Sequence, residues 1–125
     1  MVKEELLYTE THEWIRLDGK IATMGITDYA QKELGDIVYV ELPEVDSELS
    51  AGDVLATVEA VKAVEEIYMP LDGIIVEIND QLADASEIIN SSPYDEGWIV
   101  KFEITSQDEL EGLLDADEYK KLVGE

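Results

Sequence analysis

The chain of 125 residues contains no cysteine, only one histidine and few basic side chains. Without cysteine it has no disulfide framework, no thiol nucleophile and no thiolate ligand for a metal ion. Because His12 is the only histidine, a polyhistidine metal centre is excluded and a histidine-based catalytic triad has little basis. No apolar run approaches the roughly 20 residues that a membrane-spanning helix needs. The sequence therefore predicts neither metal nor thiol chemistry, nor a membrane span.

The scarcity of basic residues leaves the chain strongly acidic. Eight Lys and Arg stand against 31 Asp and Glu, which gives a formal net charge of -23. Nucleic acids and anionic membranes are poor partners for such a chain, because phosphate binding depends on clustered Lys and Arg. The charge either serves solubility, or steers the encounter with basic partner surfaces, or reflects a saline habitat. Residues 1–5 show neither an apolar signal region nor an arginine-rich transit character, so we expect a cytoplasmic protein.

Length and patterning predict one domain over residues 1–125 and a mainly β fold. Hydrophobic residues make up 46% of the chain, enough for a core without disulfides. Short apolar runs separated by turn residues are typical of a flattened antiparallel barrel or sandwich with short peripheral and C-terminal helices. We expect strands at residues 13–17, 21–26, 36–42, 54–58, 64–68, 73–78 and 98–104, helices at 28–34, 106–114 and 115–123, and a helical turn within 82–89.

Capping residues fix several of these boundaries. Thr27 is a candidate N-cap for the helix at 28–34, and Gly35 ends that helix. Ser106 with Glu109 forms a capping-box pattern, and the signal repeats at Asp115. The tail at about 106–123 is expected to pack on the sheet through Leu110, Leu113, Leu114, Tyr119 and Leu122, and the helix at 28–34 through Tyr29, Ala30 and Leu34.

The most unusual stretch surrounds Lys62. Two strand-like runs, 54–58 and 64–68, flank it, so a hairpin would place Lys62 at or near the tip. It is the only basic residue between Lys32 and Lys101, and Glu59, Glu65 and Glu66 surround it in sequence. Spacing alone leaves a solvated surface lysine as the default interpretation.

Four motifs give a more specific interpretation. They are E-A-V-K-A with Y-M-P-L-D-G at 59–63 and 68–73, Y-T-E-T-H-E-W at 8–14, G-I-T-D-Y-A-Q with L-G-D-I-V-Y-V-E-L-P at 25–31 and 34–43, and I-N-S-S-P-Y-D-E-G-W at 89–98. Together they resemble the glycine cleavage system H protein family over about residues 8–119. Three positions depart from the family pattern: Ala60 replaces the usual Ser, Asp46 a common Gly, and Ser86 a usual Pro.

The resemblance implies a carrier of the lipoyl/biotinyl-carrier fold type and not an enzyme. Lys62 would bear lipoate as N6-lipoyllysine, with Glu59, Ala60, Val61 and Ala63 recognised by the lipoate-attaching enzyme. The arm would take an aminomethyl group from a pyridoxal-phosphate glycine decarboxylase to a tetrahydrofolate-dependent aminomethyltransferase, and dihydrolipoamide dehydrogenase would reoxidise it. We expect the carrier to be a monomer.

The resemblance also implies a cleft that protects the loaded arm. Its polar residues would be Thr11, Glu13 and Glu66. Thr11 and Glu13 are two residues apart on an expected strand edge, so both side chains should point to one face. His12 would then face away, and we interpret it as structural or capping.

Alternatives remain open at this stage. A lipoyl domain of a 2-oxoacid dehydrogenase is also a carrier, but usually has D-K-A at the lysine; a biotinyl domain usually has Met on both sides of it, where this chain has Val61 and Ala63. An H-protein paralogue could instead relay lipoate to other carriers or act, unmodified, as an interaction or regulatory protein.

Overall fold

The computed structural model describes residues 2–125, apart from the side chains of residues 107–109. Within that range the chain forms nine strands, four α-helices and one 3-10 helix. The strands are β1 (Leu7–Tyr8), β2 (Glu13–Asp18), β3 (Ile21–Ile26), β4 (Ile37–Glu41), β5 (Glu48–Leu49), β6 (Val54–Ala60), β7 (Val64–Tyr68), β8 (Gly73–Ile78) and β9 (Val100–Ile104). The helices are α1 (Asp28–Leu34), α2 (Gln81–Asp84), α3 (Ile88–Ser91), η1 (Gln107–Gly112) and α4 (Ala116–Val123).

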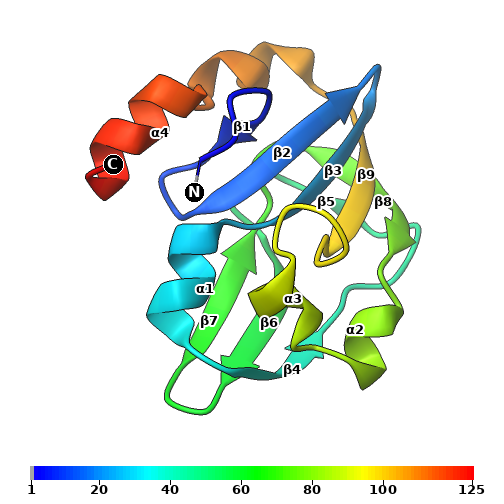
Figure 1. Cartoon of the computed structure of the whole chain (residues 1–125). Helices are drawn as coiled ribbons and strands as arrows, with labels where there is room; N and C mark the ends of the chain where they lie inside the picture. Colours follow the sequence, from blue (N-terminus) through cyan, green and yellow to red (C-terminus); the bar gives the residue numbers. More distant parts are fainter. Residues whose placement is uncertain (1) are drawn as a thin grey trace.

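Two antiparallel sheets make up the body of the molecule. One has the order β1-β2-β3-β9-β8-β5 and the other the order β4-β6-β7 within the described residues. In Figure 1 the larger sheet fills the upper half of the view with η1 and α4 beside it, while the smaller sheet points downward with α1 along its side. The predicted fold class, a flattened antiparallel sandwich with short helices at its edges, is confirmed.

The main core lies where the two sheets face each other. Its members include Ile15, Met24 and Phe102 from the larger sheet and Val58 and Ile67 from the smaller one, all at most 1% exposed. The period-2 pattern of β6 and β9 sends alternate side chains into this layer. This burial holds the β6–β7 hairpin firmly at its base, which matters for what its tip presents.

A second cluster joins the C-terminal helix to the opposite side of the larger sheet. Tyr8, Trp14 and Tyr119 are fully buried there, and Leu114 pairs with Tyr8 in an isolated bridge. The predicted packing of the tail is therefore correct for Tyr119, whereas Leu122 is 50% exposed and was wrongly placed in that contact.

The first hairpin follows the predicted boundaries with one shift. Asp18 extends the strand expected at 13–17 by one residue and pairs with Ile21, so the two-residue loop is Gly19-Lys20. Gly19 has φ +63°, a conformation that favours glycine. Gly25 permits the close approach that its position in the strand suggested, because a Cβ there would lie 3.0 Å from Nε1 of Trp14.

Three predicted helical features differ from the structure. The segment expected as a helix at 106–114 is the 3-10 helix η1, and Ser106 makes no side-chain capping bond. The reciprocal contact expected of Glu109 lies outside the described side chains. Residues 82–89 contribute to two short helices, α2 and α3, and the helix at Asp115 begins with the predicted capping box, completed by Glu118. No strand was predicted between residues 42 and 54, where β5 lies, because a two-residue strand carries no periodic signal.

Two departures from the family pattern have visible local geometry. Asp46 has φ +75°, the left-handed region that a glycine adopts without strain. Its N–H donates to the carbonyl of Ile75 at 2.7 Å, which fixes the loop on β8. Ser86 is buried, with its hydroxyl 3.4 Å from the carbonyl of Ile37.

Candidate functional site

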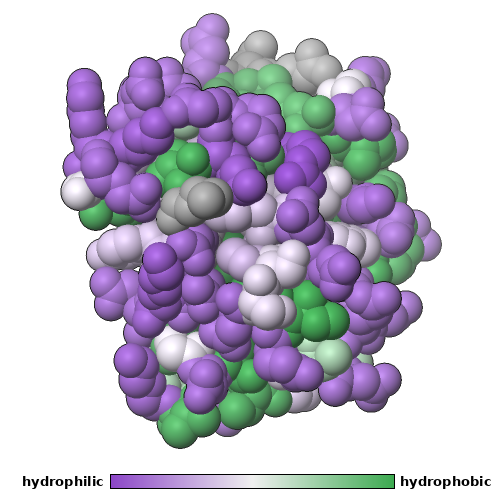
Figure 2. Space-filling model, in the orientation of Figure 1, coloured by the Kyte–Doolittle hydropathy of each residue, from purple (hydrophilic) through white to green (hydrophobic). Residues whose placement is uncertain are grey.

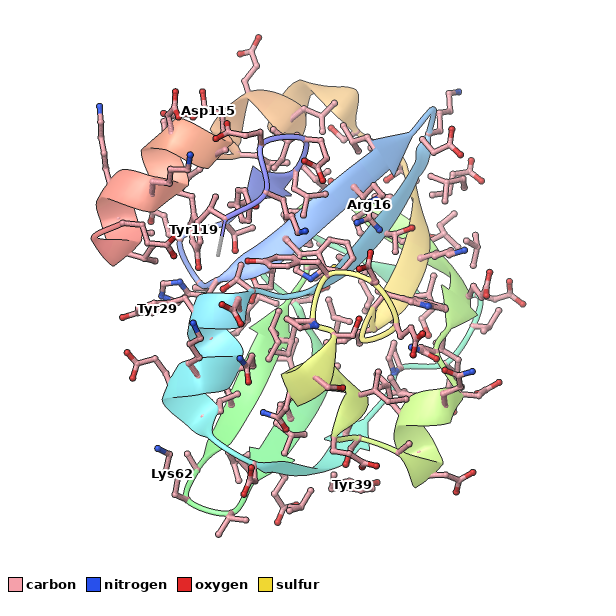
Figure 3. The ribbon with its side chains drawn as sticks, viewed as in Figure 1. Arg16, Tyr29, Tyr39, Lys62, Asp115 and Tyr119 are labelled. Carbon is pink, nitrogen blue, oxygen red and sulfur yellow. The ribbon has the colours of Figure 1, made fainter. Side chains whose placement is uncertain are left out.

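Lys62 stands at the tip of the β6–β7 hairpin. Glu59 pairs with Val64, and the N–H of Ala60 donates to the carbonyl of Ala63 at 2.7 Å, so residues 61–63 form a short turn. The side chain of Lys62 is exposed, and Val61 beside it is 76% exposed. In Figure 3 Lys62 projects from the lower end of the molecule, opposite α4 and its capping residue Asp115. The predicted position of Lys62 at the tip of a hairpin is confirmed.

A loop next to the hairpin holds the tip in place. The N–H of Val61 donates to the carbonyl of Asp36 at 3.0 Å. Gly35, which ends α1 with φ +78°, lies so close that a Cβ there would be 3.1 Å from Cε of Lys62. The aliphatic stem of Lys62 therefore runs over the C-terminal end of α1, where the backbone conformation of Gly35 favours glycine.

Asn90 braces this loop. Its Nδ2 donates to the carbonyl of Gly35 and to Oε1 of Gln31, both at 2.9 Å, and its Oδ1 accepts from the N–H of Ile37 at 2.9 Å. One amide thus satisfies the end of α1 and the start of β4 together. The rigid presentation of Lys62 depends on this contact between segments far apart in sequence.

A groove of about 350 Å³ runs between α1 and the edge strand β7. We call it the side groove. Its apolar part is formed by Ile26, Leu34 and Ile67, which are almost completely buried, and it begins at Ala63, the residue after Lys62. It is lined by Thr11, His12, Ile26, Tyr29, Ala30, Glu33, Leu34, Ala63, Glu65 and Ile67.

The side groove corrects one prediction about α1. Tyr29, Ala30 and Leu34 were expected in the core, but only Leu34 is fully buried. Tyr29 and Ala30 are half-buried and form a wall of the groove, although Ala30 also packs against the core as expected. Helical spacing identifies an apolar face but does not distinguish a core from a groove wall.

Glu13 is the most unusual ionisable residue of the site. It is 1% exposed, and its Oε1 accepts hydrogen bonds from the hydroxyls of Thr9 at 2.5 Å and Thr11 at 2.6 Å. Its Oε2 accepts from the N–H of Tyr68 at 3.3 Å. Burial raises the pKa of Glu13 above its ordinary value. The three hydrogen bonds lower this pKa by a smaller amount, and repulsion from Glu65 raises it slightly further. A buried, well-bonded carboxylate is suited to receive a cation.

Glu13 faces a second cleft of about 630 Å³, which we call the Glu13 pocket. It also includes Thr9, Thr11, Tyr68 and Met69. Thr11 lines both this pocket and the side groove, so the two hollows meet at its side chain. Thr11 therefore borders both the groove that begins beside Lys62 and the pocket lined by Glu13.

The contact between Thr11 and Glu13 has a different origin from the one predicted. β2 begins at Glu13, and Thr11 and His12 lie in the preceding turn, where His12 has φ +70°. The hydroxyl of Thr11 reaches Glu13 through this turn and not through strand alternation. For the same reason His12 does not face away but lines the side groove beside Thr11. Its Nδ1 lies 2.8 Å from the hydroxyl of Tyr119, so it also has the structural contact that was expected.

The acidic residues around Lys62 divide between the two faces of β7. Glu65 lines the side groove together with Ala63 and Ile67, whereas Glu66, in register with Thr57 on β6, points to the opposite face. Glu59 and Glu66 are exposed on that outer face. The structure thus brings Thr11 and Glu13 together. Glu65, which the sequence did not single out for the cleft, lies on the groove side of β7, whereas Glu66 lies on the other side.

Two kinds of feature are absent from the part of the chain that the structure describes. No group of three or more His, Asp and Glu side chains there is placed to hold a metal ion. No described helix is long and apolar enough to cross a membrane. A braced hairpin that presents one exposed lysine beside an apolar groove fits the class of carrier proteins.

Comparison with known proteins agrees with that class. A family model described as glycine cleavage H-protein matches residues 6–125. The glycine cleavage system H protein of Staphylococcus epidermidis is 52% identical over 124 residues, covering 99% of this chain and 98% of that protein. The corresponding protein of Staphylococcus haemolyticus is 51% identical over the same shares. A crystal structure of a glycine cleavage system H protein from Mycobacterium marinum has a TM-score of 0.90 at 35% identity, covering 99% of this chain and 100% of that one.

The chain belongs to the glycine cleavage H-protein family. Members of this family are carrier components of the glycine cleavage system and not catalysts. The resemblance that the four sequence motifs indicated is confirmed over almost the whole chain.

Several residues of the site could not have been identified from sequence reasoning alone. Asn90 was part of a motif, but its three hydrogen bonds join segments more than 50 residues away. Tyr29, Glu33 and Glu65 line the side groove only because α1 packs along β7. No local pattern in the sequence reports that packing.

Proposed function

We propose that this chain is the lipoyl-bearing carrier of the glycine cleavage system, with lipoate attached to Nζ of Lys62 as N6-lipoyllysine. The observation that carries the proposal is the position of Lys62, exposed at the tip of a braced hairpin within the region that the family model matches. Glu59, Ala60, Val61 and Ala63 surround it on the hairpin, and the exposed Glu59, Val61 and Ala63 form the surface that a lipoate-attaching enzyme would contact. Ala60 is buried, so the replacement of the usual Ser leaves the exposed surface of the tip unchanged.

The residues near Lys62 fit a long apolar arm in amide linkage. The side groove starts at Ala63 and offers Ile26, Leu34 and Ile67 as apolar contacts. Attachment removes the ammonium charge, so an arm lying in this groove would bury no cation against them. When attached, the lipoyl group supplies the disulfide–dithiol chemistry that accepts the aminomethyl group and gives it up.

The chain's own residues would hold and shield the carried amine. The carboxylate of Glu13 retains acceptor capacity on Oε2, which receives one long hydrogen bond from Tyr68. A cationic amine at this carboxylate would make a charge-assisted hydrogen bond in a largely dry site. Thr11 orients the carboxylate, and Glu65 adds negative charge from β7. Glu66 would act from the outer face, on encounter with a partner.

We assign the partners by family membership: the pyridoxal-phosphate glycine decarboxylase as donor, the tetrahydrofolate-dependent aminomethyltransferase as acceptor, and dihydrolipoamide dehydrogenase as reoxidant. A flexible arm on a rigid tip raises the effective concentration at each of these active sites. The staphylococcal relatives are bacterial proteins, and we place the cycle in the cytoplasm, with the carrier working as a monomer.

Peptide mapping after incubation with a lipoate ligase, lipoate and ATP tests the proposal. We expect one lipoyl adduct, on the peptide that contains Lys62, and a change in formal charge from -23 to -23 - 1 = -24. Lys62→Arg should remain folded and unmodified, while the matched variant Lys20→Arg should be modified like the wild type. An adduct on Lys20 or Lys101, or a protein that stays unmodified and is inactive with the decarboxylase, would contradict the carrier function and favour an interaction or relay role.

A further inference from the structure

The hydroxyl of Tyr119 joins three segments that are far apart in the sequence. Tyr119 lies on α4, and its hydroxyl is 2.8 Å from Nδ1 of His12 and 2.7 Å from Oγ1 of Thr27. Thr27 is the N-cap of α1 and accepts from the N–H of Ala30 at 3.2 Å. The N–H of Thr27 in turn donates to the carbonyl of His12 at 3.0 Å. The C-terminal helix thus reaches the turn before β2 and the start of α1 through one oxygen atom.

These two segments form adjoining walls of the side groove, with the rings of His12 and Tyr29 4.8 Å apart. The turn contributes Thr11 and His12, and α1 contributes Tyr29 and Ala30. Tyr119 itself is fully buried and stacks on Tyr8 with ring centroids 4.5 Å apart. Figure 3 shows Tyr119 close to Tyr29, where α4 approaches the start of α1. The position of one wall relative to the other therefore depends on a side chain outside the groove.

The hydrogen atoms in this network have one arrangement that satisfies every group. Oγ1 of Thr27 receives the N–H of Ala30 and donates its own proton to the oxygen of Tyr119. Burial raises the pKa of Tyr119 to about 12, so its hydroxyl keeps a proton, which it donates to Nδ1 of His12. The neutral imidazole is then protonated at Nε2. In the reverse order the buried hydroxyl of Thr27 would lack an acceptor among the described contacts, which costs free energy.

We propose that Tyr119 is a positioning residue of the side groove: its hydroxyl clamps the turn at 9–12 to the N-cap of α1 and fixes His12 as the neutral tautomer that carries its proton on Nε2. The groove is then bordered by an uncharged donor in place of a cation. Burial lowers the pKa of His12, while Glu65 and Glu33 raise it, and the hydroxyl clamp adds a geometric reason for the neutral form. If the chain carries an aminomethyl arm as proposed above, a neutral His12 would not repel the cationic amine held near Glu13.

Hydrogen exchange of the unmodified protein tests the clamp with a matched pair of variants. Tyr119→Phe and Tyr8→Phe each delete one buried hydroxyl from the same aromatic stack, but the hydroxyl of Tyr8 bonds to the backbone of Lys3, away from the groove. We expect the N–H groups of Thr27 and Ala30 to exchange roughly tenfold faster in Tyr119→Phe, the factor that corresponds to about 1.4 kcal/mol of local opening. Tyr8→Phe should leave them unchanged, as should Thr27→Ser, which keeps both the cap and the donor.

The tautomer has a separate readout, because His12 is the only histidine in the chain. Nitrogen NMR of the imidazole at pH 8 should show Nε2 protonated and Nδ1 unprotonated in the wild type and in Tyr8→Phe. Tyr119→Phe should show a mixture of both tautomers. Proton density on Nδ1 in the wild type, or equal exchange at Thr27 and Ala30 in the two phenylalanine variants, would overturn the proposal.

Both measurements use protein without lipoate, so their outcome does not depend on modification of Lys62. Failure of lipoylation with normal results here would contradict the carrier function and leave the clamp intact. Normal lipoylation with equal exchange in the two phenylalanine variants would contradict the clamp and leave the carrier function intact. Intact mass and the exchange data therefore separate the two proposals.

Discussion

At the scale of single residues, Glu13 combines a functional position with a cost in stability. Burial raises its pKa above the ordinary value of 4.5, so the folded chain binds this proton more tightly than the unfolded chain. Its contribution to stability therefore falls as the pH rises from 4.5 through the folded-state pKa, and the ionised form is destabilising above that window. Natural proteins tolerate such costs where function needs the group.

The first prediction compares Glu13→Gln with the wild type across pH. The amide keeps the shape of the side chain, and its oxygen can still accept from Thr9 and Thr11, but it carries no buried charge. Its NH2 group would face the N–H of Tyr68 in place of Oε2, a cost that does not depend on pH. We expect the variant to gain stability relative to the wild type as the pH rises from about 4.5 to 7. Urea unfolding at several pH values measures this difference in the free energy of unfolding. The contributions of the other carboxylates are the same in both proteins and cancel in the difference. A difference that is flat or shrinks with rising pH would contradict the assignment.

The second prediction concerns the loaded carrier and follows from the proposed function. Glu13→Gln should release formaldehyde faster from isolated aminomethyl-loaded protein, by roughly tenfold for each 1.4 kcal/mol of lost interaction. Glutamine is the better substitution, because Glu13→Ala would leave the hydroxyls of Thr9 and Thr11 without their acceptor and cost about 1–3 kcal/mol of folding stability. Glu65→Gln should show a smaller increase, and Glu66→Gln, on the opposite face of β7, none. Equal rates in all four proteins would remove these carboxylates from any protective role.

At the scale of elements, the tip of the β6–β7 hairpin is rigid because the end of α1 supports it. Gly35 has φ +78° and ψ -153°, a region that is essentially restricted to glycine, and its Cα lies beneath the stem of Lys62. The carbonyl of Asp36 and the side chain of Asn90 complete the support. The hairpin alone would be marginally stable in water, so presentation of the lysine is a property of several elements together.

The third prediction is that Gly35→Ala destabilises the protein and disturbs the tip. The strained backbone should cost about 1–3 kcal/mol. Lys62 should also be lipoylated more slowly, because a shift of the strained backbone would displace the carbonyl of Asp36, which accepts from the N–H of Val61. Gly112→Ala is the matched control, since a Cβ there meets nothing within 4 Å, and it should stay within about 0.5 kcal/mol of the wild type. Chemical denaturation and a time course by intact mass measure the two effects; unchanged stability in Gly35→Ala would contradict the described turn.

At the scale of the whole molecule, negative charge dominates the surface. Figure 2 shows hydrophilic side chains over most of one face, with small separate apolar areas. The exposed outer side of the smaller sheet near Lys62 carries Glu59 and Glu66 beside the apolar Tyr39 and Val64. Tyr39 and Lys62 lie at the same end of the molecule in Figure 3, far from both chain ends in Figure 1. A partner can therefore approach the arm without contact with α4.

The fourth prediction is that association with the decarboxylase weakens as salt screens this surface. The Debye length shrinks from roughly 10 Å at 0.1 M to 3 Å at 1 M, so the association rate should fall across that range. A Glu59→Gln/Glu66→Gln double variant should associate more slowly and depend less on salt. A Glu103→Gln/Asp117→Asn variant removes the same charge from the other half of the molecule and should behave nearly like the wild type. Stopped-flow or surface-binding kinetics decide this, and a salt-independent rate would leave solubility as the role of the charge.

Much of the fold follows from local sequence. Thr27, Gly35 and the capping box at Asp115 set helix ends because their side chains or backbone conformations act within four residues. Strands β3, β7 and β8 have the predicted bounds, since short apolar runs between turn residues specify them directly. The hairpin position of Lys62 is of the same kind, as it depends only on its two neighbouring strands.

The groove and its chemistry were decided by tertiary structure. The sequence placed Thr11 and Glu13 together for the wrong reason, put Tyr29 in the core, and gave no sign that His12 meets Tyr119, 107 residues away. Periodicity reports which face of an element is apolar, but not which other element lies against that face or how close it comes. Burial of Glu13, the wall formed by α1 along β7, and the clamp from α4 all depend on such distances between elements, so they exist only in the folded chain.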